Sequence, residues 1–162
     1  MKLIKDSQKR MHIQEKTLKD IEFYSVLDQM SAYCMTHLGT ERDLQCKPFS
    51  KKEDLLIALK RTNDYLASFE NDNRIPNHGF EPITKEIQLL KIENSYFETV
   101  SFRNIKAISM ASNVFIIFLK KFHEYYPHLF EFSSTIPVTT ELIHQIVAII
   151  DRFGDVKDNA SP

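Results

Sequence analysis

Residues 105–119, IKAISMASNVFIIFL, decide the fold, because they are apolar at helical spacing on nearly every side. A helix that is apolar all round lies either at the centre of a bundle or under a partner that covers it. We expect this helix to begin near Thr99 or Ser101 and to reach about His123. Its longest unbroken apolar run, Val114 to Leu119, has six residues and is far shorter than a membrane span. The segment is therefore predicted to be the core helix.

The chain before this segment also has helical periodicity. Thr17 with Asp20 resembles a capping arrangement, and Gly39 suits the position just after a helix end. The pattern predicts one amphipathic helix between them, followed by a short helix that Thr40 caps and that reaches about Cys46. The apolar face of the first helix would consist of Phe23, Val26, Leu27, Met30, Cys34 and Leu38.

A second amphipathic helix is predicted to follow Ser50, a good N-cap with Glu53 three residues later. Its basic residues balance its acidic ones, Asp64 among them, which is typical of a solvated face and not of an anion-binding strip. The next segment, 71–80, is dense in Asn, Pro and Gly and predicts a loop. The stripe expected to be buried on this helix is Leu55, Leu56, Leu59, Leu66 and Phe69.

Three more helices complete the prediction. One covers about 83–92, one opens at Pro127 and runs through about Phe132, and the last begins at Thr139 or Thr140 and ends at Gly154. There is no sustained strand alternation and no internal repeat, so the predicted class is all-α, a bundle of about five to seven helices. Residues 17–162 would form this helical core domain, preceded by a basic, flexible segment at 1–16.

The charge argues against a domain that grips nucleic acid by itself. The net charge is −1, whereas such domains usually carry a strong basic excess. Residues 1–16 hold five basic and two acidic side chains, a local charge of +3 that is typical of a solvated terminus. No apolar secretory segment follows Met1, and two cysteines make no disulfide framework. We expect a cytoplasmic protein without a membrane partner.

Neither glycines nor histidines form a motif that carries chemistry. A Walker phosphate loop needs clustered glycines before a Lys-Ser/Thr pair, but the three glycines stand alone at positions 39, 79 and 154. His123 and His128 are five residues apart with Pro127 between them, whereas a zinc-binding helix needs a spacing of four. Neither an ordinary P-loop site nor a zinc-protease helix is predicted.

The cysteines leave one alternative open. Cys34 and His37 are three residues apart, and Cys46 could bring a third soft zinc ligand. Cys34 lies on the predicted apolar stripe, however, where free cysteine usually acts as a small hydrophobe. A catalytic cysteine would need a histidine base that folding brings to it, so a small helical enzyme stays a third hypothesis. We assign no catalytic, cofactor-binding or metal-binding residue, and nucleic-acid contacts stay unassigned.

Several short segments occur in a recognisable order along the chain. They are TLKDIEF at 17–23, LGTE at 38–41, CKP at 46–48, TND at 62–64, IP at 75–76 with Gly79, and IDRFGDVKDNASP at 150–162. This order resembles the N-terminal region of the second bacterial MutS paralogue, a DNA-repair-like ATPase that usually ends in an Smr domain. The resemblance covers about residues 17–162.

The resemblance implies a fold and a role. In that family this region is the helical core domain and leads into long lever helices, so the chain is expected to be a fragment of a longer protein. The implied function is a non-catalytic module that relays the ATPase state to a DNA clamp, in mismatch-repair-like suppression of recombination. The fragment itself would need no cofactor. The parent would be a homodimer that binds ATP and magnesium downstream, carries in some members a nuclease-like domain, and acts on branched or duplex DNA or on stalled ribosomes.

One feature of true MutS proteins is not carried over. The triplet Phe122-His123-Glu124 matches their Phe-x-Glu mismatch wedge, but this paralogue group lacks the domain that holds the wedge. Phe122 is expected to be a core residue, because a wedge must be exposed to enter a base step. The alternative function is a stand-alone module for protein–protein interaction, in which the apolar helix docks a partner helix.

Overall fold

The computed structural model describes residues 13–76 and 79–160, and its regular elements in these ranges are helices. The predicted all-α class is confirmed. The described ranges hold eight helices, one more than the upper expectation, because the N-terminal helix is divided. They are α1 (Glu15–Asp20), α2 (Phe23–Ser31), α3 (His37–Leu44), α4 (Lys52–Glu70), α5 (Thr84–Leu89), α6 (Thr99–Lys121), α7 (Pro127–Ser133) and α8 (Thr140–Ile149).

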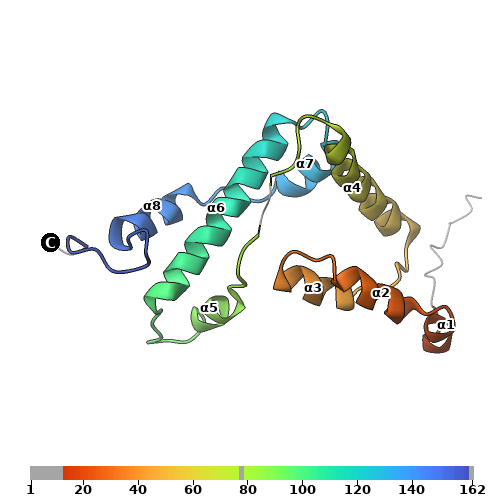
Figure 1. Cartoon of the computed structure of the whole chain (residues 1–162), viewed down its shortest axis with the longest axis horizontal. Coiled ribbons are helices and arrows are strands. Elements are labelled where there is room, and N and C mark those ends of the chain that lie inside the picture. The colour runs from red at the N-terminus through yellow and green to blue at the C-terminus, as the bar shows by residue number, and fades with distance from the viewer. Residues whose placement is uncertain (1–12, 77–78, 161–162) are drawn as a thin grey trace, which may run out of the picture.

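The two long helices, α4 and α6, diverge from a common junction. Figure 1 shows them as the arms of an open V with the short α7 at its apex. Helix α7 contacts both arms, and α8 packs along α6. On the other arm's side, α1 packs on α2 and α2 on α3. Helix α7 is thus the element that joins the two arms.

The single helix predicted between Thr17 and Gly39 is wrong. The chain leaves the helical path at Glu22, whose φ of 56° is left-handed, and again between α2 and α3. Left-handed backbone without glycine is uncommon, so the sequence offered no breaker at this position. The apolar periodicity continues across the break and made the segment look like one helix.

Gly39 and Thr40 have different roles from those predicted. Gly39 lies inside the first turn of α3, and the N-cap is Thr36, whose hydroxyl oxygen accepts a 3.0 Å hydrogen bond from the Gly39 N–H. A Cβ on Gly39 would lie 3.1 Å from the same oxygen. Glycine therefore leaves room for the capping hydroxyl and does not end the preceding helix.

The last helix ends earlier than predicted, at Ile149. An antiparallel bridge between Ile150 and Val156 follows, and Asp151 closes the turn between them. Gly154 is the left-handed residue of this turn, with a φ of 97°, and is not the helix C-cap. Hydrogen bonds from the backbone N–H of Asp155, Phe153 and Gly154 hold the pKa of the Asp151 carboxyl below its ordinary value.

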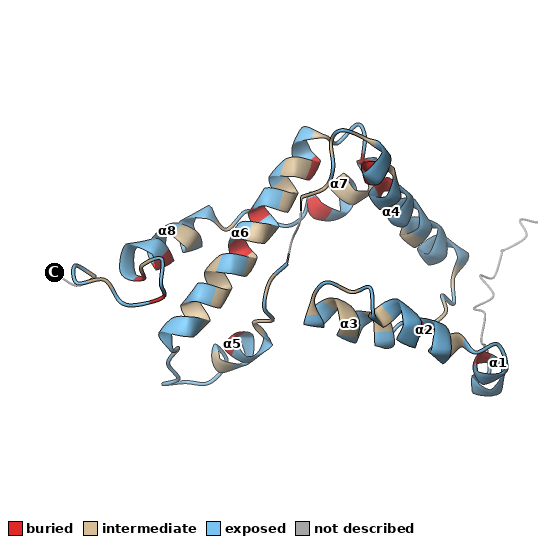
Figure 2. Cartoon of the chain, viewed as in Figure 1, coloured by how far each residue is buried: buried red, intermediate tan, exposed pale blue. Residues whose placement is uncertain are grey.

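Few large apolar side chains are buried among the described residues. The predicted stripe on α4 is exposed, and α6, expected to be the core helix, buries only part of its surface, with Met110, Val114 and Ile117 exposed. Figure 2 shows α4 largely exposed and α6 as alternating exposed and half-buried segments, with buried positions near α7 and at the end of α8. The pattern identified apolar faces correctly but could not tell which of them have a partner. The buried apolar residues are Leu18, Leu27, Leu119, Tyr126, Ile146 and Ile150.

The capping of α3 can be tested with Thr36→Ala and, as the matched control, Thr40→Ala. We expect Thr36→Ala to lower the free energy of unfolding by about 1 kcal/mol, because an N-cap hydrogen bond is lost. Thr40→Ala should cost clearly less, because its hydroxyl bonds only back to the Thr36 carbonyl. Urea titrations followed by circular dichroism measure both values. If Thr40→Ala lowered the free energy of unfolding more than Thr36→Ala, Thr40 would be the cap, as predicted from the sequence.

Candidate functional site

The joint between α4 and α7 is built on one buried carboxylate. Asp64 is 6% exposed, and its Oδ2 accepts hydrogen bonds from the backbone N–H of His128 at 2.7 Å and of Leu129 at 3.1 Å. The His128 ring adds a contact of 3.1 Å between Nδ1 and Oδ1. The N-cap of α7, Tyr126, makes no side-chain capping bond. Asp64 therefore caps α7 from another helix and places a negative charge at the positive end of its dipole.

A second polar joint connects α6 with α8. Asn113 is buried on α6, and its Oδ1 accepts hydrogen bonds from the backbone N–H of Thr139 at 2.9 Å and from its hydroxyl at 3.2 Å. Thr139 is the N-cap of α8. Both arms of the V thus hold the start of a short helix through a buried polar side chain, α4 at the first turn of α7 and α6 at the N-cap residue of α8. These directional bonds fix the angle at which each short helix leaves its arm.

Tyr126 anchors the apex to the chain that follows α4. Its side chain is fully buried, and its hydroxyl donates a hydrogen bond to the Asn73 carbonyl. Its ring stacks near Phe118 of α6, with centroids 5.9 Å apart. The N-cap residue of α7 therefore contacts α6 and the loop that follows α4, and it is held by packing as well as by a hydrogen bond.

Helix α4 has the inverse of the usual distribution of side chains. The face toward α7 buries Asp64 and Ser68, while the opposite face is apolar and exposed. Sequence reasoning placed Asp64 on the solvated face and the leucines inside, and both placements are wrong. The exposed fractions on the outer face are 39% for Leu55, 54% for Leu59, 57% for Leu66 and 58% for Phe69.

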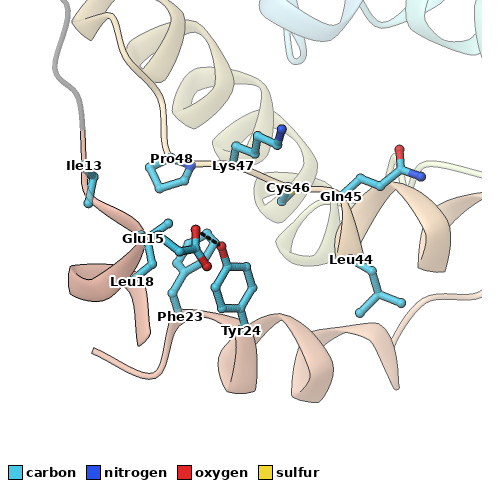
Figure 3. A pocket seen from close by; sticks show the side chains of 10 residues that line it. All are labelled: Ile13, Glu15, Leu18, Phe23, Tyr24, Leu44, Gln45, Cys46, Lys47 and Pro48. Atoms are coloured by element: carbon cyan, nitrogen blue, oxygen red, sulfur yellow. Dashed lines mark hydrogen bonds between the residues drawn. The ribbon is translucent and has the colours of Figure 1, made fainter. Parts of the chain in front are cut away.

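A pocket of about 360 Å³ lies between α1, the start of α2 and the segment after α3 (Figure 3). In it the Tyr24 hydroxyl donates a 3.0 Å hydrogen bond to Glu15 Oε2. This bond and the negative charge of Glu15 raise the pKa of Tyr24 above its ordinary value. Cys46 lines the same pocket, but no histidine does. Among the described residues, the histidine base that a catalytic cysteine would need is therefore not placed beside Cys46.

The three candidate metal ligands in the N-terminal half do not form a site. Cys34 is half-buried with its thiol 4.0 Å from the Met30 carbonyl, Cys46 is exposed, and the His37 ring lies 3.5 Å from Glu41. Across the ranges that the structure describes, no group of three His, Cys, Asp or Glu side chains could hold a metal ion.

The histidines near α7 have separate partners. His123 contacts the Lys120 carbonyl at 3.1 Å, and His128 contacts Asp64. Phe122, the first residue of the triplet that matches a mismatch wedge, is half-buried against Phe118 with ring centroids 4.8 Å apart. His128 also lines a pocket between α4 and α7, together with Arg61 and Glu131.

Comparisons with known proteins give the chain a family context. Endonuclease MutS2 of Bacillus velezensis is 25% identical over 153 residues, which cover 93% of this chain and 19% of that protein. Endonuclease MutS2 of Staphylococcus aureus is 27% identical over 155 residues, which cover 92% of this chain and 19% of that protein. Endonuclease MutS2 of Alkaliphilus oremlandii is 24% identical over 150 residues, which cover 91% of this chain and 19% of that protein. The chain is related to one region of MutS2.

This MutS2-related chain spans about a fifth of the length of the curated relatives it matches. No family model matches it, and no solved structure matches it significantly. The comparisons agree with the resemblance drawn from the order of the short segments, at the level of a region shared with MutS2.

The joint at Asp64 can be tested by removing its carboxylate. We expect Asp64→Ala to lower the free energy of unfolding by about 2–3 kcal/mol, because hydrogen bonds to a buried charged group are among the stronger ones. Asp64→Asn, which keeps an acceptor oxygen, should lower the free energy of unfolding by less. The control is Asn63→Ala on the exposed side of the same helix, which should change the free energy of unfolding by no more than about 0.5 kcal/mol. Equal losses for Asp64→Ala and Asn63→Ala in urea titrations would contradict the cap.

Proposed function

We propose that the chain is a non-catalytic helical core module of a MutS-like, ATP-dependent DNA-binding protein. The observation that carries the proposal is the similarity to one region of MutS2 along more than nine-tenths of the chain. In this role the module relays the state of an ATPase elsewhere in the longer protein to a clamp on DNA. The process served would be mismatch-repair-like suppression of recombination.

The architecture supports a mechanical role. Coupling between distant sites needs stiff elements with discrete arrangements. The arms α4 and α6 have 19 and 23 residues, and α7 joins them, bonded to α4 through the buried Asp64 carboxylate and packed on α6 beside the Tyr126–Phe118 ring contact. A frame of this kind can carry a rotation from one end of the molecule to the other. Its exposed apolar faces are suitable docking surfaces for further helices of the same protein.

The remaining parts of the proposal follow from the resemblance. ATP and magnesium would bind outside these residues, since the three glycines of the chain are isolated and form no phosphate loop. The longer protein would work as a cytoplasmic homodimer on branched or duplex DNA, with stalled ribosomes as a further target in some members. The module itself would need no cofactor.

A second candidate function is a stand-alone module for protein–protein interaction. The exposed apolar faces of α4 and α6 favour it, because such faces in a soluble protein usually mark interaction sites. The two functions differ in what covers these faces. In the core module, other parts of the same polypeptide cover them, whereas in the stand-alone module a separate protein does.

The scaffold role predicts that the 162-residue chain does not grip DNA by itself. With a net charge of −1, it should show no measurable binding to branched or duplex DNA at about 0.15 M salt. Fluorescence anisotropy across a salt series measures this, with the same chain tested for ATP hydrolysis in parallel.

Tight binding with a steep salt dependence would contradict the scaffold role. It would mean that folding gathers the scattered lysines and arginines into a phosphate-contacting face. The chain would then be part of the clamp itself.

A further inference from the structure

The outer face of α4 carries a nearly continuous apolar stripe. Its five positions follow one another at steps of four and three residues, as the a and d positions of a coiled coil do. All five are exposed, and Leu59, Leu66 and Phe69 are each more than half exposed. We call this face the α4 stripe; it consists of Leu55, Leu59, Thr62, Leu66 and Phe69.

The α4 stripe lies opposite the side of the helix that contacts α7. Asp64 is buried on that side and caps α7, and the Arg61 guanidinium lies 4.5 Å from the ring centre of Phe132 in α7. At 3.6 residues per turn, Leu55 is half a turn away from Asp64 around the helix. Helix α7 therefore covers the inner half of α4 and leaves the stripe on the outer half.

The contacts of the stripe itself stay within α4. The Thr62 hydroxyl donates a 3.1 Å hydrogen bond to the Ala58 carbonyl, and the Phe69 ring packs edge-on against Tyr65 with centroids 5.3 Å apart. Of the helices in the described ranges, α7 packs most extensively on α4, and it does so on the other side. The stripe is a second face of α4, without a partner among the described residues.

The charges on the outer half of α4 stand at its two ends and have opposite signs. Lys52 lies one heptad step before the stripe, and Glu70 follows its last residue. They are 18 residues apart, which is five turns of 3.6 residues, so both lie on the same flank of the stripe. The residues between them on this half of the helix are uncharged. Within the described ranges, neither side chain forms an ion pair.

This arrangement is complementary to itself when two copies run antiparallel. If Thr62 of one copy faces Thr62 of the other at a twofold axis, Leu55 of each copy lies opposite Phe69 of the other. The twofold axis keeps the two matching flanks on one side, so Lys52 of each copy lies beside Glu70 of the other. A parallel pair would instead place lysine level with lysine and glutamate level with glutamate.

We propose that the α4 stripe binds the α4 stripe of a second copy of this chain, with the two helices antiparallel. The bond from Thr62 to the Ala58 carbonyl means that burying the stripe leaves no hydroxyl unsatisfied. One helix per copy makes an interface below the standard size, so the dimer is weak and reversible. The inference goes beyond the proposed function and does not depend on it, because the stripe and its end charges belong to this chain alone.

The stripe suits a second copy better than a lipid surface. An interfacial membrane helix is rich in lysine and arginine on a polar face that stays free toward water. In α4 the polar side is covered by α7, Arg61 is engaged with Phe132, and Glu70 beside the stripe would meet anionic head groups with the same charge. Among the described residues, the helix long and apolar enough to cross a membrane is α6, a property that core helices of soluble proteins share.

The first test measures self-association of the whole 162-residue chain by sedimentation velocity over a range of concentrations. We expect a reversible monomer–dimer equilibrium with a dissociation constant in the micromolar range. Leu66→Asp places a charge in the stripe of both copies and should weaken the dimer at least about tenfold. The matched control Ile57→Asp, exposed on the same helix but on the side of α7, should leave the equilibrium unchanged. Circular dichroism verifies that both variants are folded.

Charge-reversed variants make the test specific to the antiparallel pair. Lys52→Glu sets glutamate beside glutamate at both ends and should weaken the dimer at least about threefold. Adding Glu70→Lys to it exchanges the two charges and should restore the dissociation constant to within about twofold. The control Lys60→Glu makes the same charge change on the inner half of α4 and should have no effect.

Cross-linking reports the orientation separately. In a variant with Cys34 and Cys46 replaced by serine, Thr62→Cys should form a disulfide between copies under mild oxidation with copper phenanthroline and air. Leu55→Cys should not, because the two copies of residue 55 would lie about 21 Å apart along an antiparallel pair. Equal cross-linking at both positions would indicate a parallel pair and overturn the proposal.

The remaining outcomes also decide the proposal. A chain that stays monomeric at all concentrations, or a dimer that Leu66→Asp leaves intact, would overturn it. A monomer that binds vesicles of anionic lipid, with binding that Leu66→Asp abolishes, would overturn it in favour of a membrane surface. The DNA titration is independent of these results: DNA binding by the chain would contradict the scaffold role, whereas the absence of a dimer would contradict the stripe pairing alone.

Discussion

The structure depends on the hydrogen bonds that the Asp64 carboxylate accepts at the start of α7. Helix α7 has seven residues, and its own N-cap residue makes no capping bond, so its first turn needs an acceptor from elsewhere. Asp64 supplies it from α4, 64 residues earlier in the chain than His128. Because α7 also contacts α6, the same bonds join the two arms of the V. Asn113 accepts hydrogen bonds from Thr139, the residue before α8, so a second polar contact holds the start of that helix on α6.

This reliance on polar joints explains the distribution of apolar side chains. The buried positions of the arms are Asp64 and Ser68 on α4 and Ser109, Asn113 and Leu119 on α6, while other leucines, valines and isoleucines, such as Leu66 and Ile117, face outward. Exposed apolar faces of this kind are suited to packing against further helices. The similarity to one region of the much longer MutS2 proteins agrees with this arrangement. In the proposed function, the chain is a frame that positions interaction surfaces for the parts that dock on it.

The sequence was sufficient for the fold class and for most helices, because apolar spacing and prolines are local signals. The helix that opens at Pro127 and the long helix from Thr99 are as predicted. Capping was less predictable, since Thr36 and Thr40 are chemically equivalent candidates and the backbone geometry chooses between them. The joints were missed because Asp64 resembles any charge on a solvated helix until α7 is placed against it. An Asp within an apolar helix, followed by Ser68 one turn later, was the available signal.

The central claim is that the outer faces of α4 and α6 are accessible while the polar inner faces are buried. Thiol labelling tests it directly in a variant with Cys34 and Cys46 replaced by serine. Single cysteines are introduced as Leu66→Cys, Ile117→Cys and, as the nearly isosteric buried control, Ser68→Cys on the same helix as Leu66. The account predicts rapid labelling at Leu66→Cys and Ile117→Cys and strong protection at Ser68→Cys. Protection of Leu66→Cys equal to that of Ser68→Cys, at low protein concentration, would contradict it.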